Sequence, residues 1–384
     1  MLHRTKTAQI IAAADLAIFK KNRSLAWLTQ DAWQQMVSQQ AFIDTLAQAS
    51  ACLQLPAWQG SLADITIHRS FQQPYQVVAV DGSQIYPDHH LQGVDCFLVN
   101  VGYCHLAYGE QSSARLDATP HLLTSLQAKT TYKQNYFAAD MVDLIREDYE
   151  LALLVQLAQA LTLRGTEPLV GLFDGNVFFW HLGFKMPAVK DVFFARYATH
   201  LTALHEQRFL YAGYLSGTQF ADVVALVRAG LCEGTDACGL TGTQLYDLCS
   251  MLDGLSDADL FATVLAPGER TTLFACTGSL AEAYPAHSKP WFFYLNAGEE
   301  VVRIEVPAWI AHDAASVATI AECALDQSIK GFGYPVALAE AHAQAVVAGA
   351  DRLFFYQLLQ AHSVARQRQV VMSPKSMKKK VLGV

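Results

Sequence analysis

The sequence predicts an α/β fold in which helices flank a mixed β-sheet, with a helical N-terminal extension before it. Apolar residues recur at helical spacing from residue 7 to about residue 55, and the spacing changes to strand-like runs from about residue 75. Further on, two apolar runs end in Asp-Gly and are separated by a long helical segment, as expected for strands joined by a helical crossover. We therefore expect an extension over residues 1–70 and one α/β domain over residues 71–384.

Composition supports a folded protein with a large core. Apolar residues make up 52% of the 384 residues and charged residues 16%, so widespread disorder is not expected. The net charge of −8 by itself disfavours a nucleic-acid partner, although a metal site built from carboxylates contributes negative charge of its own. No two of the eight cysteines form a Cys-x-x-Cys pair, which argues against a zinc ribbon. Without a run of about 18 apolar residues or a secretory leader, the chain is expected to be cytoplasmic and to span no membrane.

The individual elements are predicted from apolar periodicity and from the turn residues between them. In chain order we expect helices within 7–55, two or three strands between 75 and about 110, a long helix at 138–163, a strand at 168–176, helices at 190–210, 219–231 and 242–263, a hairpin at 291–307, and mainly helix to about 366. The hairpin is expected because aromatic and β-branched arms surround Asn-Ala-Gly.

Asp81 and Asp174 each end an apolar strand-like run, and a glycine follows each of them. Asp-Gly between apolar runs also forms hairpin turns, so one such pair alone is ambiguous. Two carboxylates on neighbouring strands, about 4.8 Å apart, could instead share a pair of cations. Two-metal sites place their ions about 3.5–4 Å apart around a phosphoryl group. A phosphatase with Asp81 as covalent nucleophile is a rival, but that chemistry needs a second Asp two residues later, where this chain has Ser83.

Further candidates lie on two predicted helices. Glu147 and Glu150 share one flank of the long helix, where glutamates are usually solvated, and Glu150 lies farther into the apolar stretch. Downstream, Pro335 suits the first turn of a helix, Tyr334 precedes it, and His342 follows about two turns later. A lone histidine on an apolar face is more often a packed core residue than a ligand. Packing at the helix start explains Tyr334 equally well.

Taken in order, several segments resemble the NurA nuclease domain over about residues 75–350: AVDGS, the helical glutamate, LVGLFDG, AGYLSGTQFADVVALVR, LAPGERTTLF, FFYLNAGEEVVRIEVPAWIA and GYPVALAEAH. The resemblance implies a ribonuclease-H-like core and a metal-dependent DNA nuclease. It implies 5′-to-3′ exonuclease activity, with single-strand endonuclease activity as an addition, in DNA end resection and repair. It also implies two manganese ions (magnesium being the alternative), a homodimer, and a HerA-type hexameric ATPase as partner.

The same resemblance assigns the site residues. It places the metal ligands at Asp81, Glu150, Asp174 and His342, all of them also catalytic, and adds Tyr334 as a further catalytic residue. Glu147 is the alternative to Glu150, because no motif fixes the register on that helix. A catalytically silent NurA-like module that binds DNA or the ATPase is the alternative function.

Contacts to the DNA backbone are expected from positive charge outside the acidic centre. The densest basic cluster consists of Lys375, Lys378, Lys379 and Lys380, although such a run is usually a solvated tail. Arg270 and Arg303 are weaker candidates. Phe178, Phe179 and Trp180 follow the second Asp-Gly and are candidates for stacking on an unpaired base, with core packing expected for at least two of them.

Overall fold

The computed structural model describes residues 2–14, 30–31, 33–34, 36–38, 55–88, 91–92, 94–134, 137, 140–162, 167–231, 252–366 and 371–372. Its strands are β1 (Ala57–Trp58), β2 (Thr66–Ile67), β3 (Tyr75–Ile85), β4 (Leu91–Gln92), β5 (Phe97–Tyr108), β6 (Ser113–Leu123), β7 (Leu169–Asp174), β8 (Leu210–Leu215), β9 (Glu269–Arg270), β10 (Phe274–Ala275), β11 (Pro290–Asn296), β12 (Val301–Pro307) and β13 (Val371–Met372). Its helices are α1 (Arg4–Ala13), α4 (Ser125–Thr131), α5 (Met141–Thr162), η2 (Trp180–Phe184), α6 (Pro187–Glu206), α7 (Asp222–Leu231), α9 (Asp257–Val264), α10 (Ser279–Ala283), η5 (Ala286–Ser288), α11 (Ala308–Ala311), α12 (Ala314–Lys330), α13 (Val336–Ala345) and α14 (Gly349–Ala365).

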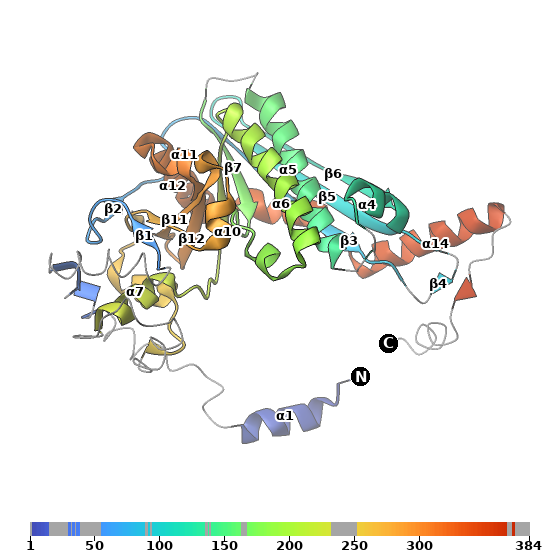
Figure 1. The fold of residues 1–384 in the computed structure, drawn as a ribbon, viewed down its shortest axis with the longest axis horizontal. Coiled ribbons are helices and arrows are strands. Elements are labelled where there is room, and N and C mark those ends of the chain that lie inside the picture. Colours follow the sequence, from blue (N-terminus) through green and yellow to red (C-terminus); the bar gives the residue numbers. More distant parts are fainter. Residues whose placement is uncertain are drawn as a thin grey trace.

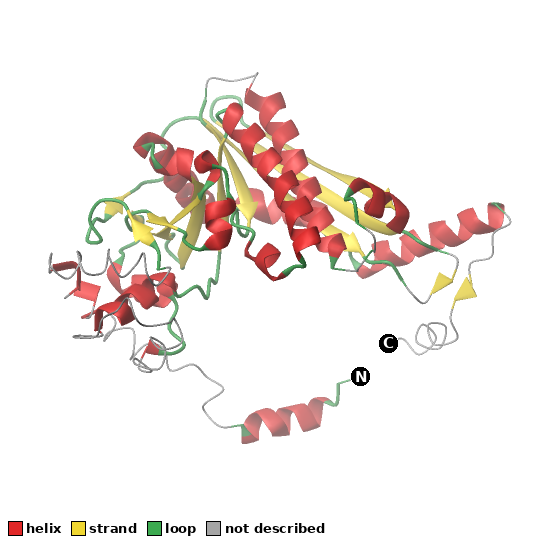
Figure 2. Cartoon of the chain, in the orientation of Figure 1, coloured by secondary structure: helices red, strands yellow, loops and turns green. Residues whose placement is uncertain are grey.

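Eleven of the described strands form one mixed sheet with helices on both sides (Figures 1 and 2). Its main path is β1-β10-β11-β12-β8-β7-β3-β5-β6. The centre consists of β3, β7 and β8, which run parallel to one another, and of β5 and β6, which continue from β3 as an antiparallel meander. The local order β6-β5-β3-β7-β8 is that of a ribonuclease-H-like sheet. The predicted fold class, an α/β mixed sheet flanked by helices, is therefore confirmed.

Residues 82 and 83 identify the helices that cover each face of β3. A β-carbon on Gly82 would meet Glu150 and Arg146 of α5, whereas the Ser83 hydroxyl donates to the carbonyl of Ala345 at the end of α13. Successive residues of a strand point to opposite faces. Helix α5 therefore lies on one face of β3, with α6 beside it in Figure 1, and α13 lies on the other.

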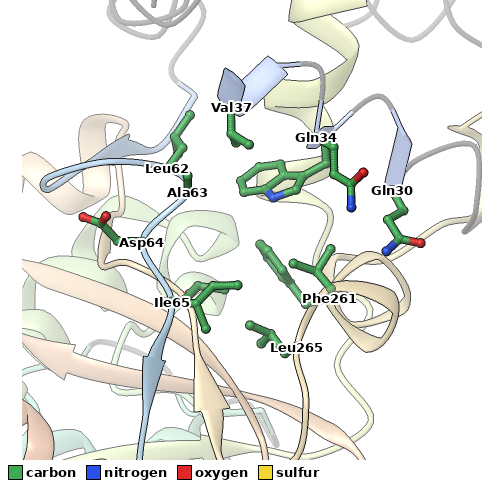
Figure 3. A pocket seen from close by; sticks show the side chains of 12 residues that line it. Gln30, Gln34, Val37, Leu62, Ala63, Asp64, Ile65, Phe261 and Leu265 are labelled. Carbon is green, nitrogen blue, oxygen red and sulfur yellow. The ribbon is translucent and has the colours of Figure 1, made fainter. Parts of the chain in front are cut away.

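A second apolar cluster lies at the far end of the sheet, where α7 and α9 pack on β11 and β12. Trp33 and Met36 contribute to it, and β1 pairs with β10 at the sheet edge, so residues of the N-terminal segment 1–70 are part of this packing. A cavity of about 180 Å³ lies here, and its lining includes Leu62, Phe261 and Leu265 (Figure 3). Apart from Asp64 its lining is apolar or uncharged, and none of the predicted site residues lines it.

Most predicted elements are present, with differences at particular strands. The long helix, the hairpin and the C-terminal helices lie where the sequence places them, as α5, β11–β12 and α12 to α14. Strands β6 and β8 were not predicted, and residues 242–251 of one predicted helix lie outside the described residues. Among the described residues, no helix combines the length and the apolar character that crossing a membrane requires.

Candidate active site

The carboxylates of Asp81 and Asp174 come from two neighbouring parallel strands. The in-register pairs of β3 and β7 end with Val80 opposite Phe173, so Asp81 and Asp174 occupy the next position on each strand. Residues at the same level of parallel strands project to the same face, about 4.8 Å apart. Strand β7 ends at Asp174, but β3 continues to Ile85 in its ladder with β5. The expectation that Asp81 ends its own strand is wrong, because it is the neighbouring strand that ends there.

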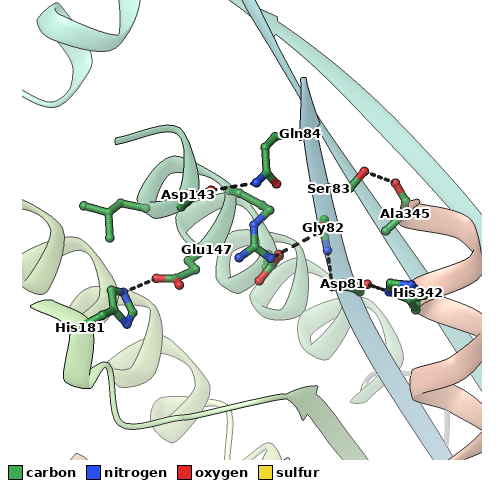
Figure 4. A network of polar contacts seen from close by, with 12 residues as sticks. Asp81, Gly82, Ser83, Gln84, Asp143, Glu147, His181, His342 and Ala345 are labelled. Carbon is green, nitrogen blue, oxygen red and sulfur yellow. Dashed lines mark hydrogen bonds and ion pairs between the residues drawn. The ribbon is translucent and has the colours of Figure 1, made fainter. Parts of the chain in front are cut away.

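Helix α13 brings His342 to Asp81 (Figure 4). Nδ1 of His342 lies 2.7 Å from Oδ2 of Asp81, and Oδ1 of Asp81 accepts from the amide of Gly82 at 2.8 Å. The Asp81 side chain is 14% exposed, whereas that of His342 is 62% exposed. His342 is therefore not packed against apolar neighbours, as its helical position had indicated. It lies at the surface with its ring open to a ligand.

Tyr334, just before α13, contacts Asp174. Its hydroxyl donates a hydrogen bond to the Asp174 carboxylate, and its ring lies edge-on to Tyr214 at 5.8 Å between centroids. Burial raises the pKa of Asp174, the bond from Tyr334 opposes this, and the charge of Asp81 adds to the rise. Burial holds the pKa of Tyr334 far above its ordinary value, so its hydroxyl stays protonated and remains a donor.

Glu150 reaches the same strand from the other face of the sheet. Its side chain projects from α5 and the residue is 3% exposed. A β-carbon on Gly82 would lie 2.4 Å from Oε1 of Glu150, so only glycine leaves room for this carboxylate. Burial raises the pKa of Glu150 to about 8, the Arg146 charge lowers it, and the Asp81 charge raises it further. Glu150 and Asp81 thus interact electrostatically across the backbone of β3.

Ser83 holds the helix that carries His342. The Ser83 hydroxyl donates to the carbonyl of Ala345 at 2.5 Å, and the side-chain amide of Asn100 donates to the same oxygen at 2.8 Å. Both bonds satisfy a carbonyl at the C-terminal end of α13, which has no partner within the helix. In the stretch Asp-Gly-Ser, the first residue meets His342, the second makes room for Glu150 and the third anchors α13.

Arg146 is a site residue that the sequence reasoning missed. Its Nη1 lies 2.6 Å from Oε1 of Glu150 and donates to the Gly82 carbonyl at 3.4 Å. Burial lowers its pKa, but the carboxylates of Glu150, Glu147, Asp81 and Asp143 raise it above its ordinary value, so its positive charge lies within the acidic group. The signal that could have identified it is the spacing Arg-x-x-x-Glu, which places both side chains on one flank of a helix.

Glu147, the alternative to Glu150, is already engaged elsewhere. Its Oε2 lies 2.9 Å from Nε2 of His181 and accepts from the hydroxyl of Tyr197 at 2.9 Å. Figure 4 shows Glu147 directed toward His181, away from Asp81. The geometry therefore favours Glu150 over Glu147 as the helical carboxylate next to β3.

A buried ion pair supports the loop that follows Asp174. Oε2 of Glu305 accepts from the amides of Val177 and Phe178, both at 3.1 Å, and its Oε1 accepts from Nε of Arg303 at 3.0 Å. Arg303 is fully buried, and its Nη1 lies 2.6 Å from Oδ2 of Asp222. Its guanidinium carbon lies 4.3 Å from the ring centroid of Phe220 and 3.7 Å from that of Phe292. Arg303 therefore cannot contact DNA, and that expectation was wrong.

The other candidates for DNA contact have mixed outcomes. Lys375, Lys378, Lys379 and Lys380 lie outside the described residues. Arg270 is engaged internally, since its Nε donates to His68 at 3.0 Å and its Nη1 to the carbonyl of Thr271. Phe178 and Phe179 are 1% and 2% exposed, so these two rings belong to the core as expected.

The donor chemistry of the site fits a divalent cation. Three carboxylates and one imidazole suit Mn²⁺, whereas Mg²⁺ prefers oxygen donors and water. Within the described residues, however, no three histidine, cysteine or acidic side chains are grouped closely enough to hold a metal ion. Two features account for this separation: Glu150 lies across β3 from Asp81, and one of its oxygens already pairs with Arg146.

Comparison with known proteins identifies similar chains. Residues 75–347 match the NurA domain. The fold is similar to the NurA nuclease from Sulfolobus solfataricus, with 12% identity, a TM-score of 0.49, and 95% of this chain and 98% of that chain covered. It is also similar to a structure of NurA with manganese (9% identity, TM-score 0.38, 86% and 95% covered) and to one of NurA bound to dAMP and manganese (10%, 0.35, 74% and 87%). A search of curated proteins gives no significant match.

Proposed function

Because this chain belongs to the NurA family of nucleases, we propose that it is a metal-dependent deoxyribonuclease that hydrolyses phosphodiester bonds in DNA. The observation that carries the proposal is the placement of Asp81 and Asp174 at the same level of two parallel strands, each with its own polar partner. His342 contacts the first and Tyr334 the second. Clustered carboxylates are costly unless a cation or a proton is bound, so their presence on adjacent strands supports a metal-binding role.

Asp81, Asp174, Glu150 and His342 would hold the cation, preferably Mn²⁺ and as a pair of ions. Held by these residues, a divalent cation would supply a bound water of lowered pKa as the nucleophile and would stabilise the leaving 3′ oxygen. Tyr334, protonated at all working pH values, donates to Asp174 and can donate to a non-bridging phosphate oxygen. Because the hydroxyl carries one proton, a bond to the phosphate would replace its bond to Asp174.

The finer features of the proposal rest on the ordered motifs shared with the family. They are degradation from 5′ ends, with single-strand endonuclease activity as an addition, in DNA end resection and repair. They also include a homodimer, a HerA-type hexameric ATPase as partner, and a cytoplasmic location. A silent module that only binds DNA or the ATPase has no use for aspartates at the same level of two strands, which is why we place it second.

The test is cleavage of linear DNA labelled at its 5′ or its 3′ end, in Mn²⁺, Mg²⁺ or EDTA. The Asp81→Ala variant is compared with wild type and with Asp117→Ala, an exposed aspartate on β6 that serves as the matched control. We expect Mn²⁺-dependent cleavage by wild type and the control and none by Asp81→Ala, with early loss of the 5′ label. Absence of cleavage by wild type with every metal, with and without the ATPase, would contradict the proposal.

A further inference from the structure

The turn before Tyr334 displays an aromatic side chain with an unusual backbone. Phe332 is 96% exposed, and its φ of 56° lies in the left-handed region. The left-handed conformation is unfavourable for a residue with a β-carbon, and a fully exposed phenyl ring gains no burial in return. Such strained residues persist where the surrounding structure enforces them, and they concentrate at functional sites.

The surrounding structure does enforce this turn. The amides of Gly331, Phe332 and Gly333 donate to carbonyls near the end of α12, at 3.0, 3.3 and 2.9 Å. A β-carbon on Gly331 would lie 1.8 Å from the carbonyl oxygen of Tyr334, so the chain can fold back here only at a glycine. Gly333, with φ of 112°, is the second residue that needs glycine's freedom.

Gln327 fixes both ends of the turn. Its side-chain nitrogen donates to the hydroxyls of Tyr75 and Tyr108, at 2.8 and 3.0 Å, and its side-chain oxygen accepts from the amide of Ala337 at 3.1 Å. One buried glutamine thereby joins α12, the start of α13 and the strands beneath them. The phenyl ring of Phe332 is consequently held on a rigid support.

The geometry points to Phe332 as a stacking platform for an unpaired base of the DNA strand whose phosphate reaches Asp174 and Tyr334; this inference rests on the proposed function. Phe332 is two residues from Tyr334, so their Cα atoms are at most about 7.6 Å apart. The inference therefore requires the ring to face the strand that the Tyr334 hydroxyl contacts, where it would meet the base of the same or the next nucleotide. An unpaired base offers its face to the ring, whereas bases in a duplex are already stacked.

The charge around the turn indicates that a DNA base, and not a backbone phosphate, contacts Phe332. A β-carbon on Gly333 would lie 3.3 Å from the side chain of Glu299, and Glu300 accepts from the Ser216 hydroxyl at 2.6 Å. Glu299 lies against the turn, and Lys330, which ends α12 just before it, is already paired with Asp326, so the local charge repels the DNA backbone. A neutral nucleobase can approach Phe332 without that penalty, with the backbone directed away from the glutamates.

The experiment measures binding in EDTA, so that cleavage does not interfere. Fluorescence anisotropy of a labelled single-stranded oligonucleotide, a blunt duplex and an abasic oligonucleotide of the same length is compared for wild type, Phe332→Ala and Phe332→Trp. Phe354→Ala, an exposed phenylalanine on α14, is the matched control. We expect Phe332→Ala to bind the single strand roughly 5- to 150-fold more weakly. Binding of duplex and abasic DNA should be unchanged, and Phe332→Trp should bind like wild type.

Two results would overturn the inference. In the first, Phe332→Ala binds the single strand as tightly as wild type, and any effect appears instead as a change of oligomeric state in light scattering. In the second, binding of all three DNAs falls by the same factor. Cleavage by wild type is measured separately. If wild type cleaves DNA but Phe332→Ala binds single and double strands in the same proportion as wild type, this inference alone is contradicted. A wild type that binds single strands through Phe332 but never cleaves contradicts the proposed function alone.

Discussion

A β-carbon placed on Gly82 would lie 2.4 Å from Oε1 of Glu150 and 2.8 Å from Cγ of Arg146. The backbone of β3 at Gly82 therefore packs directly against the buried carboxylate of Glu150. The neighbouring residues Asp81 and Ser83 face the opposite side of the sheet, toward α13. The negative charge of Asp81 raises the pKa of Glu150, and only Gly82, which has no side chain, separates the two.

We expect Gly82→Ala to lower Mn²⁺-dependent cleavage by at least about 100-fold, because an added methyl group displaces Glu150 or moves β3. Overpacking of this kind also costs about 1–3 kcal/mol of stability. Cleavage rates and urea unfolding measure the two effects. The control is Gly349→Ala, at a position where a β-carbon meets nothing within 4 Å. Equal activity of Gly82→Ala and wild type would show that Glu150 is not confined by β3.

The stability of the metal-free protein should fall as the pH rises. Burial raises the pKa of Glu150 from its ordinary value of 4.5 to about 8. Between these values the unfolded chain has lost the proton that the folded protein keeps, so the folded state becomes progressively less favoured. The loss is on the order of several kcal/mol and is complete above about pH 8. Urea unfolding in EDTA from pH 4.5 to 9 tests this.

The variant Glu150→Gln should reduce that slope by the contribution of Glu150, because a glutamine has no proton to lose, while Asp257, whose pKa burial raises to about 7, keeps its own contribution. At pH 8.5 it should be more stable than wild type, although inactive. An identical slope in wild type and Glu150→Gln would assign the pH dependence to other groups.

Breaking the buried pair behind Asp174 should be severe. Glu305→Gln removes one of the two carboxylates that pair with the fully buried Arg303 and leaves only Asp222, and we expect a loss of about 3–5 kcal/mol of unfolding free energy. Cleavage by the remaining folded protein should fall as well, since Glu305 also binds the amides of the loop after Asp174. The control is Glu282→Gln, which breaks an exposed pair with Lys289 and should change stability by less than about 1 kcal/mol. Similar losses in both variants would refute the special role of the buried pair.

Relief of strain at Phe332 should stabilise the protein and weaken its contact with single strands. Phe332→Gly removes the β-carbon from a left-handed residue, and we expect a gain of about 0.5–1 kcal/mol after the entropic cost of glycine. Phe332→Ala keeps the β-carbon and should show no such gain. Chemical denaturation of the three proteins distinguishes these outcomes. A destabilised Phe332→Gly would mean that the ring contributes packing.

The sequence was sufficient for the features that depend on local pattern. The strand around Asp81, helix α5 and the β11–β12 hairpin all have strong periodicity. Strand β6 was missed because its burial is low along most of its length and it contains Pro120, which normally argues against a strand. Strand β8 was missed because it lies in the short interval between the helices expected at 190–210 and 219–231.

The site was predictable in its residue types but not in its arrangement. The motif resemblance assigned Asp81 and His342, whose contact at 2.7 Å is a finding of the structure. Periodicity could not show that Glu150 approaches β3 from the opposite face, since register and helix rotation are tertiary properties. For the same reason it could not show that Arg146 lies among the carboxylates or that Arg303 is buried.

The ladder between β3 and β5 makes activity a reporter of correct folding. Eleven residue pairs join these strands, from Tyr75–Tyr108 to Ile85–Leu98. A register shift of β3 by one residue would turn Asp81 toward α5 and Gly82 toward α13. The Asp81 carboxylate would then lie against Glu150, and His342 would face a glycine instead of a carboxylate. A misfolded population with this slip would be compact and rich in β-structure, yet unable to cleave. Specific activity therefore measures the fraction of molecules in which the sheet has formed in register, a property that circular dichroism cannot detect.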